Sequence, residues 1–319
     1  MQQPTIVDIQ KLVAAHFPEL TVNSFQRTSL GNINWVYFVE TAQKRLVVKV
    51  VYRKDREEQE ILAKEAEIIQ KLNQQNIKGV PKLYAFDPSQ KLAPFIYLIE
   101  EYLPGEPFIS QEKKLKQADL PPIIKEMAEY MTALQQIKLA KITEFEKTRP
   151  EFTSFKDYVE KFAPKYYQVA VESKKLDQKL CADSLDFIKE KAGKIQDTSF
   201  VLAHSDISSH NILLDDHNQM IGVIDYEAAQ TLTPEYDLVT SYHEFLHRYP
   251  GMWNLLLQEY VKMNKIPPNF KERLNIIMGY RAWRYLYVAI KNQIWQYLPG
   301  DIKRMEEVLD GSFSKTIKI

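Results

Sequence analysis

The chain has 319 residues, and its 42 lysine and arginine side chains balance its 42 aspartate and glutamate side chains. This neutrality argues against nucleic acid as the main partner, because binding to a phosphate backbone requires a basic excess. No apolar stretch approaches the roughly 20 residues of a membrane-spanning helix, and the first residues lack the apolar core of a signal peptide. A single cysteine, Cys181, excludes an internal disulfide and fits a reducing compartment. We therefore expect a cytoplasmic protein, large enough for two lobes, with no membrane or nucleic-acid partner.

The first part of the chain shows a helix pattern followed by strand patterns. Apolar residues at helical spacing predict a short amphipathic helix over 5–16. Two runs rich in β-branched and aromatic residues, 35–39 and 46–51, predict an antiparallel hairpin. The loop before this hairpin is either an ordinary turn or a loop whose backbone N–H groups bind phosphate. Its candidate phosphate-binding residues are Ser29, Gly31, Asn32 and Asn34.

Lys49 lies in the middle of the second β-branched run, where a charged side chain is costly unless it has a partner. A helix predicted over 53–74 follows, and Glu65 lies on it. A strand lysine paired with a helix glutamate is how kinases hold the α- and β-phosphates. Glu60 is a rival partner, because the loop before the helix leaves its register open. The alternative without function is an edge-strand lysine that extends to water.

Two more strand patterns, 80–87 and 95–99, precede an abrupt change in the chain. Residues 100–105 read Glu-Glu-Tyr-Leu-Pro-Gly, and the proline and glycine end the strand. After residue 110 helical patterns prevail. A strand that breaks between a β-rich half and a helical half predicts a hinge between two lobes, where a purine base can bind free backbone groups.

The stretch 200–247 is the most informative, with eight acidic residues and no lysine or arginine. Three short apolar runs, 200–203, 212–214 and 221–224, predict buried strands. Polar residues follow or precede these runs, and their side chains would be held rigidly at the strand ends. They are His204, Asp206, His210, Asn211 and Asp225.

Three interpretations of these polar residues are open. An asparagine and a carboxylate can hold Mg²⁺ while a second carboxylate accepts the proton of an attacking hydroxyl, as phosphoryl transfer requires. The spacing His-x-Asp-x-x-x-x-Asn, with an Asp after the next strands, matches this kinase set. His204, Asp206, His210 and Asp225 would alternatively be the zinc or two-metal ligands of a metallohydrolase. The interpretation without function is a buried loop whose Asp and Asn cap turns.

Taken together, these motifs resemble the aminoglycoside phosphotransferase and choline kinase family, which has a protein-kinase-like fold. The matching pieces run in the family's order over about residues 25 to 240. They are the 29–34 loop, Lys49, Glu65, the 98–105 hinge, His204-Ser205-Asp206 with Asn211, Ile224-Asp225-Tyr226-Glu227, and Thr233-Pro234-Glu235-Tyr236-Asp237. The resemblance implies an α+β two-lobed fold. A small antiparallel-sheet lobe over 1–102 would bind nucleotide, and a larger, mainly helical lobe over 103–319 would carry the catalytic loop and acceptor site.

The resemblance also implies roles for individual residues. Asp206 would be the catalytic base, and Asn211 and Asp225 would be ligands of Mg²⁺. Lys49, held by Glu65, would bind the phosphates of ATP or GTP together with the 29–34 loop. The backbone of Glu100 and Tyr102 would receive the adenine. Asp237 would brace the catalytic loop without touching substrate.

The sequence departs from the family pattern in several places. Ser205 stands where the family usually has glycine, and the nucleotide loop keeps one glycine only. Asp225 is not followed by Phe-Gly, and no activation-loop pattern follows it. A small-molecule acceptor is therefore favoured over a protein. A pseudokinase that binds nucleotide without turnover is the remaining alternative, and the intact catalytic set argues against it.

The acidic side chains of this stretch suggest a cationic acceptor. If Glu227, Glu235 and Glu244 face the site, their field would favour a cationic hydroxyl compound. An aminoglycoside-like amino sugar is the first choice, and choline, ethanolamine or homoserine is the second. The alternative is that these acids cap helices or pair with Arg281, Arg284 or Lys291.

Overall fold

The computed structural model describes the chain except for residues 1–2, 29–33, 52–55, 144 and 146–149, and it leaves the side chains of 56–58 undescribed. The described residues divide into two compact units. The first comprises those of 1–110 and 211–229 together with Phe145, and the second comprises the others. The division at residue 102 remains a prediction. By packing, the segment 211–229 belongs with the N-terminal part of the chain.

The first unit contains a five-stranded antiparallel sheet in the order β1-β2-β3-β5-β4. The strands are β1 (Val22–Arg27), β2 (Asn34–Thr41), β3 (Arg45–Val51), β4 (Leu83–Asp87) and β5 (Tyr97–Glu101). The hairpin predicted from the two β-branched runs is confirmed, with Val36 of β2 opposite Lys49 of β3.

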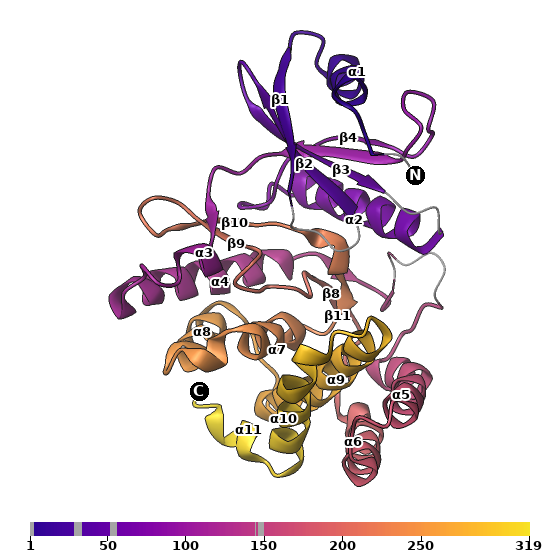
Figure 1. The fold of residues 1–319 in the computed structure, drawn as a ribbon. Coiled ribbons are helices and arrows are strands. Elements are labelled where there is room, and N and C mark those ends of the chain that lie inside the picture. Colours follow the sequence, from indigo (N-terminus) through magenta and orange to yellow (C-terminus); the bar gives the residue numbers. More distant parts are fainter. Residues whose placement is uncertain (1–2, 29–33, 52–55, 144, 146–149) are drawn as a thin grey trace. The chain divides into compact units, whose positions relative to one another are not determined.

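Helices α1 (Ile6–His16) and α2 (Arg56–Gln74) pack against opposite faces of this sheet (Figure 1). Val48 and Val50 join the core cluster that contains α1, whereas Val51 joins the cluster that contains Leu62 of α2. Successive side chains of a strand point to opposite faces. Lys49 therefore points toward α2, the helix that carries Glu65.

A second, three-stranded sheet of the first unit places the end of β10 close to the loop before β4. It consists of β6 (Glu106–Pro107), β9 (Ile212–Leu214) and β10 (Met220–Val223), which confirms two of the short strands predicted after residue 200. A Cβ on Gly222 would overlap the carbonyl oxygen of Gly79, so the close approach requires glycine. The Val223 N–H donates to that same oxygen at 2.9 Å. These contacts fix the backbone just before Asp225.

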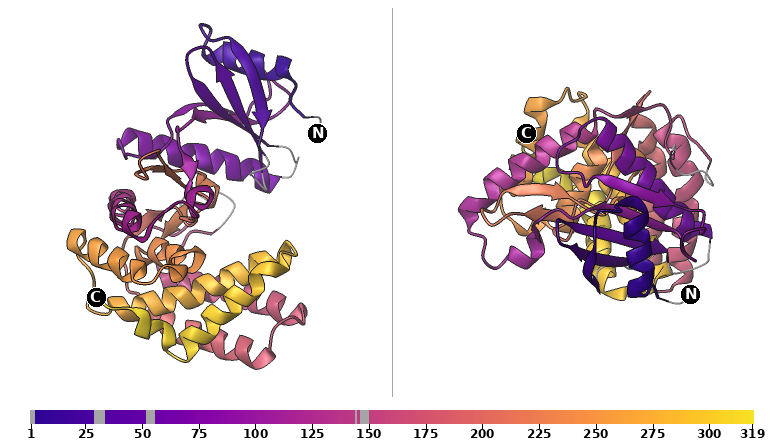
Figure 2. Two further views of the ribbon diagram at one scale, coloured as in Figure 1. Left: turned by 60° about the vertical axis from the view of Figure 1, so that its left-hand side comes forward. Right: turned by 90° about the horizontal axis from the view of Figure 1, so that it is seen from above.

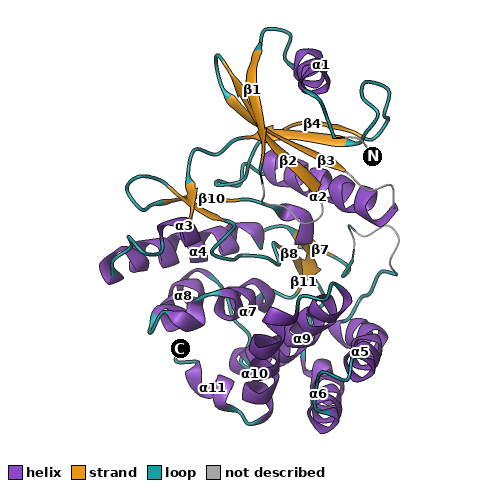
Figure 3. Cartoon of the chain, in the orientation of Figure 1, coloured by secondary structure: helices purple, strands orange, loops and turns teal. Residues whose placement is uncertain are grey.

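The second unit is mainly helical, as Figure 3 shows. Its longer helices are α4 (Leu120–Leu134), α5 (Phe155–Glu172), α6 (Gln178–Lys191), α7 (Glu235–Glu244), α8 (Met252–Met263), α9 (Phe270–Lys291) and α10 (Leu298–Leu309). Short helices are α3 (Phe108–Gln111), which spans the division along the chain, and α11 (Ser312–Thr316). A small sheet joins β11 (Gln230–Leu232), β8 (Phe200–Ala203) and β7 (Lys138–Leu139). Figure 2 shows α9 beside α10 and α5 beside α6.

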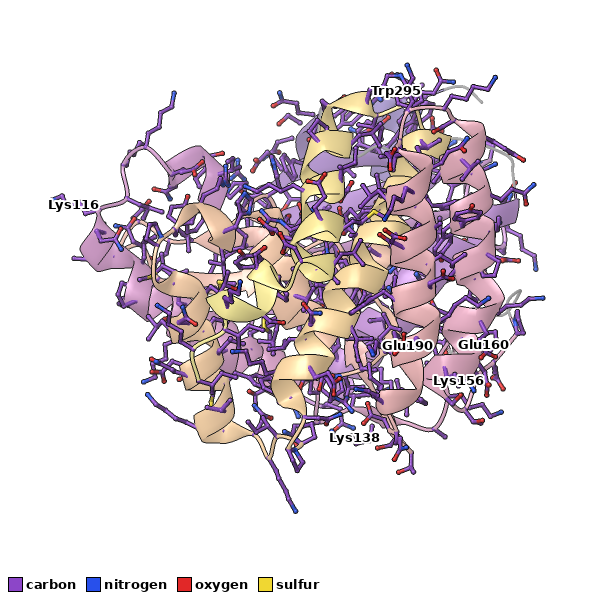
Figure 4. The ribbon with its side chains drawn as sticks, turned by 90° about the horizontal axis from the view of Figure 1, so that it is seen from below. Lys116, Lys138, Lys156, Glu160, Glu190 and Trp295 are labelled. Atoms are coloured by element: carbon purple, nitrogen blue, oxygen red, sulfur yellow. The ribbon has the colours of Figure 1, made fainter. Side chains whose placement is uncertain are left out.

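An aromatic core holds α5 against α9. The rings of Tyr158 and Tyr280 lie 5.6 Å apart, and those of Phe155 and Tyr280 lie 5.5 Å apart. Tyr280 and Trp283 of α9 are fully buried and are thus core residues. In Figure 4, charged side chains such as Lys156 and Glu160 lie at one end of α5, near Glu190 of α6. None of the helices in the described part of the chain combines the length and hydrophobicity of a membrane span.

Candidate active site

Lys49 and Glu65 form a buried ion pair in the first unit. The Lys49 Nζ lies 2.5 Å from Glu65 Oε1, and the two side chains are 7% and 0% exposed. The predicted pairing with Glu65 is confirmed, and with it the register of α2. It follows from the alternation of β3, because Lys49 shares the face of the sheet that α2 covers.

Two further carboxylates approach the same ammonium group. Glu100 Oε1 lies 3.5 Å from Lys49 Nζ, and Asp225 Oδ1 lies 3.6 Å from it. Burial lowers the pKa of Lys49, but the carboxylates of Glu100, Glu65 and Asp225 outweigh this effect and raise it well above its usual value. Burial in turn raises the pKa of Glu100 to about 7 and also raises the pKa of Glu65. One cation therefore serves three acidic groups, which leaves the cluster with an excess of negative charge when all three are ionised.

Glu100 has a place that the sequence does not suggest. The sequence assigns only its backbone to adenine binding, whereas the structure puts it inside β5, opposite Val47 of β3 and Leu83 of β4, with its carboxylate buried. The two-residue period of a strand is the feature that could have predicted this position. Leu98 lies opposite Lys49, and Glu100, two residues further along β5, lies on the same face of the sheet. Tyr102 follows the end of β5, and the Cζ atom of Arg45 lies over its ring, 4.6 Å from the ring centroid. The adenine-binding role of the two residues stays a prediction.

Glu65 also fixes the turn that carries Asp225. The Tyr226 N–H donates to Glu65 Oε1 at 3.2 Å, so the carboxylate that holds Lys49 holds this turn as well. Asp225 has a φ of 70°, a left-handed conformation that costs about 1–3 kcal/mol and is common at functional sites. Asp225 is the N-cap residue of the short 3₁₀ helix Tyr226–Ala228.

Asn211 and Asp225 lie at adjacent strand ends. Asn211 is buried just before β9, and its carbonyl accepts from the Ile224 N–H at 3.0 Å. Mg²⁺ prefers carboxylate and carbonyl oxygens and takes only one or two of them from the protein. An asparagine amide and a half-exposed aspartate at this spot fit that ion.

Most of the predicted phosphate loop lies outside the described residues, namely Ser29, Gly31 and Asn32. Asn34 is described and begins β2 opposite Val51. Its side chain is buried, and within the described ranges neither its oxygen nor its nitrogen has a hydrogen-bond partner. A buried polar group without a partner is costly and is rare in folded proteins.

In the second unit, Asp237 braces the loop that carries Asp206. Its two carboxylate oxygens accept from the backbone N–H groups of His204 at 2.9 Å and Ser205 at 2.8 Å. The expected bracing contact is thus observed. Burial raises the pKa of Asp237 to about 6, although the two N–H groups oppose this shift. Ser205 has a φ of 66°, so it holds the left-handed conformation that glycine adopts without strain.

The described residues contain no cluster of side chains that would support the zinc interpretation. Across the described part of the chain, no three His, Cys, Asp or Glu side chains gather as a metal-binding group. His204 is fully buried, and its Nδ1 accepts from the Asp206 N–H at 3.3 Å. The ring therefore stabilises its own loop.

Arginines of α9 neutralise two of the three acids that were candidates for acceptor binding. Glu235 is buried, and its Oε1 atom lies 2.5 Å from Nε of Arg273. Glu244 forms an ion pair with Arg281. Each of these two acids has a buried guanidinium as its partner, as the alternative of pairing with arginines expects, and a role of Glu235 and Glu244 in acceptor binding stays a prediction. Glu227 is half-buried in the turn after Asp225.

Comparisons with known proteins agree with this geometry. Residues 24–264 match the model of the phosphotransferase enzyme family. No curated protein matches the sequence. A solved aminoglycoside phosphotransferase, in complex with ADP and hygromycin B, shares 15% identity and a TM-score of 0.68 over 95% of this chain and 98% of that one. A spectinomycin phosphotransferase, in complex with ADP and spectinomycin, shares 16% identity and a TM-score of 0.65 over 99% of this chain and all of that one, 100%. The predicted α+β, protein-kinase-like fold is confirmed.

The raised pKa of Glu100 predicts that stability falls as pH rises. Its pKa is about 7 in the folded protein against an ordinary value of 4.5, so the folded state binds the proton more tightly. This contribution to stability is fully present below pH 4.5 and is lost as pH rises through about 7. The melting temperature should therefore fall between pH 5 and 8. Glu100→Gln should show a shallower fall, and exposed Glu19→Gln should keep the wild-type slope. Equal slopes for wild type and Glu100→Gln would contradict the assignment.

Proposed function

The chain belongs to the phosphotransferase enzyme family, and from that premise we propose that it transfers the γ-phosphate of ATP or GTP to a hydroxyl group of a small molecule. The observation that carries the proposal is the buried Lys49–Glu65 pair with Asp225 3.6 Å from the same Nζ. Phosphoryl transfer depends on such fixed charges, because the protein contributes positioning and electrostatic stabilisation rather than covalent chemistry. Consumption of ATP also fits the cytoplasmic location expected from the composition.

The first unit would hold the nucleotide. Lys49 would donate to the phosphates, since Glu65 fixes its direction and leaves other N–H donors of the ammonium group available. Asn211 and Asp225 would hold Mg²⁺ through their oxygen atoms. Mg²⁺, when bound, neutralises charge on the phosphates. The buried amide of Asn34, which has no partner in the described structure, is a candidate for a hydrogen bond with the nucleotide or its loop.

Asp206 would act on the acceptor. Its carboxylate accepts the proton of the attacking hydroxyl while the new O–P bond forms and the bond from the γ-phosphorus to the leaving nucleoside diphosphate breaks. Asp237 takes no part in this proton transfer. It holds the backbone on the N-terminal side of Asp206 through two hydrogen bonds.

The acceptor class is the part of the function that rests on analogy. Complexes of the structural neighbours contain hygromycin B or spectinomycin, which makes an amino sugar the first acceptor to test. Such an activity would confer antibiotic resistance. Choline, ethanolamine and homoserine follow as candidates from the family resemblance.

The Lys49–Glu65 pair predicts a graded loss of nucleotide binding. Lys49→Met should lower kcat/KM for the nucleotide at least about a hundredfold, because it removes the phosphate ligand and leaves Glu65 buried without its cation. Glu65→Gln should have a smaller effect in the same direction, since Lys49 keeps Glu100 and Asp225. Glu60→Gln on the same helix is the matched control. A silent Glu65→Gln with a damaging Glu60→Gln would overturn the assigned partner.

Substitutions of Asp206 and Asp225 should have different effects, the first on phosphoryl transfer and the second on binding of the nucleotide with Mg²⁺. Asp206→Asn should abolish transfer and leave the nucleotide-induced rise in melting temperature intact, because a base contacts the acceptor hydroxyl and not the nucleotide. Asp225→Asn should reduce the rise that depends on Mg²⁺. A thermal-shift series of ATP and GTP, with and without Mg²⁺, measures both. Turnover in Asp206→Asn equal to wild type would contradict the role of base.

A coupled assay of ADP release would identify the acceptor. The panel is an aminoglycoside series, choline, ethanolamine, homoserine and neutral sugars, with each reaction run at low and high salt. Amino sugars should be turned over best, and the rate should fall with ionic strength if the site attracts cations. Turnover confined to neutral acceptors and insensitive to salt would remove the amino sugar from the proposal but leave the phosphotransferase function standing.

A further inference from the structure

Ser205, the residue before Asp206, is held at each of its polar groups. Its N–H donates to Asp237 of α7 at 2.8 Å, and its carbonyl accepts from the Tyr285 hydroxyl of α9 at 3.3 Å. Its hydroxyl lies 2.9 Å from the side-chain amide of Gln230 on β11. Three separate elements of the second unit thus converge on one residue of the catalytic loop.

Arg284 sets the direction of the Gln230 amide. An amide nitrogen turned toward the guanidinium would bring two donors together, so the amide oxygen faces Arg284. In this orientation the oxygen accepts from Arg284 Nη2 at 3.2 Å, from Nη1, and from the Ser205 hydroxyl at 2.9 Å. Arg284 Nη1 also donates to the Tyr236 hydroxyl at 3.0 Å. The result is a continuous chain of hydrogen bonds from α9 to the Ser205 side chain.

The left-handed backbone conformation of Ser205 gives a physical reason for this chain of hydrogen bonds. Ser205 has a φ of 66°, a conformation in which the Cβ of an L-residue is strained and glycine is not. A glycine would relieve the strain but would offer no hydroxyl to Gln230. Buried Gln230 and buried Ser205 lie away from solvent, where a hydrogen bond is stronger and an unmade one is costly. The torsion angles of Ser205 set the direction in which the next residue, Asp206, leaves the backbone.

We propose that the Ser205 hydroxyl, Gln230 and Arg284 form a positioning relay that holds Asp206 in the orientation needed for proton transfer. The inference rests on the proposed function, in which Asp206 is the base. Ser205, Gln230 and Arg284 are positioning residues, since they act through the backbone of the loop and need no contact with nucleotide or acceptor.

Replacing Ser205 by glycine and by alanine separates strain from anchoring. Both variants lose the hydroxyl, and both should lower kcat about tenfold, the effect of one ordinary hydrogen bond, with KM for the nucleotide unchanged. Ser205→Ala keeps the strained Cβ and should melt below wild type. Ser205→Gly relieves the strain and should melt at or above the temperature of Ser205→Ala. If the hydroxyl had only a structural role, kcat would not fall in a variant that stays fully folded.

A double-mutant cycle tests whether Ser205 and Gln230 act as one unit. Gln230→Leu should lower kcat as Ser205→Ala does, and the double variant should lose little more than either single variant. Thr231→Val is the matched control, because Thr231 is the buried neighbour of Gln230 on β11 and its hydroxyl has no partner in the described structure. It should leave kcat unchanged.

Amide hydrogen exchange over 204–210, measured on every variant, gives a readout that needs no acceptor. Faster exchange there in Ser205→Gly and Gln230→Leu, but not in Thr231→Val, supports the relay. This readout holds even where hydrolysis of the nucleotide, with water as the acceptor, is too slow to measure. Wild-type kcat and wild-type exchange in both variants, with turnover lost in Asp206→Asn, would overturn the relay alone. Full turnover in Asp206→Asn would overturn the proposed function instead.

Discussion

The buried ion pair between Lys49 and Glu65 is the constraint on which the first unit depends. Removing one partner of such a pair leaves an uncompensated charge, at a typical cost of about 3–5 kcal/mol. Glu65 satisfies this requirement only if α2 covers the face of the sheet on which Lys49 lies. The same carboxylate accepts from the Tyr226 N–H. One side chain therefore fixes a strand, a helix and the turn that begins with Asp225.

Asp237 has a corresponding effect in the second unit, by a different means. No lysine or arginine pairs with it in the described structure; two backbone N–H groups satisfy its carboxylate. It lies in the first turn of α7, where the helix dipole favours a negative group. Glu235 in the same turn binds Arg273 of α9. The loop that carries Asp206 is thus supported by α7, which is itself held by α9.

The parts that the sequence predicts well are those with a clear local pattern. β-branched runs identify β2 and β3, and a charged residue within such a run identifies Lys49, because its cost demands a partner. The strands β6, β7 and β11 have only two or three residues, too few to show alternation. The buried carboxylate of Glu100 follows from its parity with Lys49, but that parity has meaning only once β3 and β5 are known to pair. Partners far apart in sequence, such as Gln230 and Arg284, leave no local signal at all.

The acidic stretch 200–247 shows why a run of like charges in a sequence does not give the charge of a site. Its carboxylates serve several purposes: Asp215 accepts from backbone N–H groups of its own turn, while Glu235 and Glu244 bind arginines that lie on α9. A field is focused on a ligand only by charges that remain unpaired near it. Acids that are already paired with arginines, such as Glu235 and Glu244, therefore add little to the field at any ligand site. Machinery for phosphoryl transfer and recognition of the acceptor are therefore separable, which is how one fold can serve different acceptors.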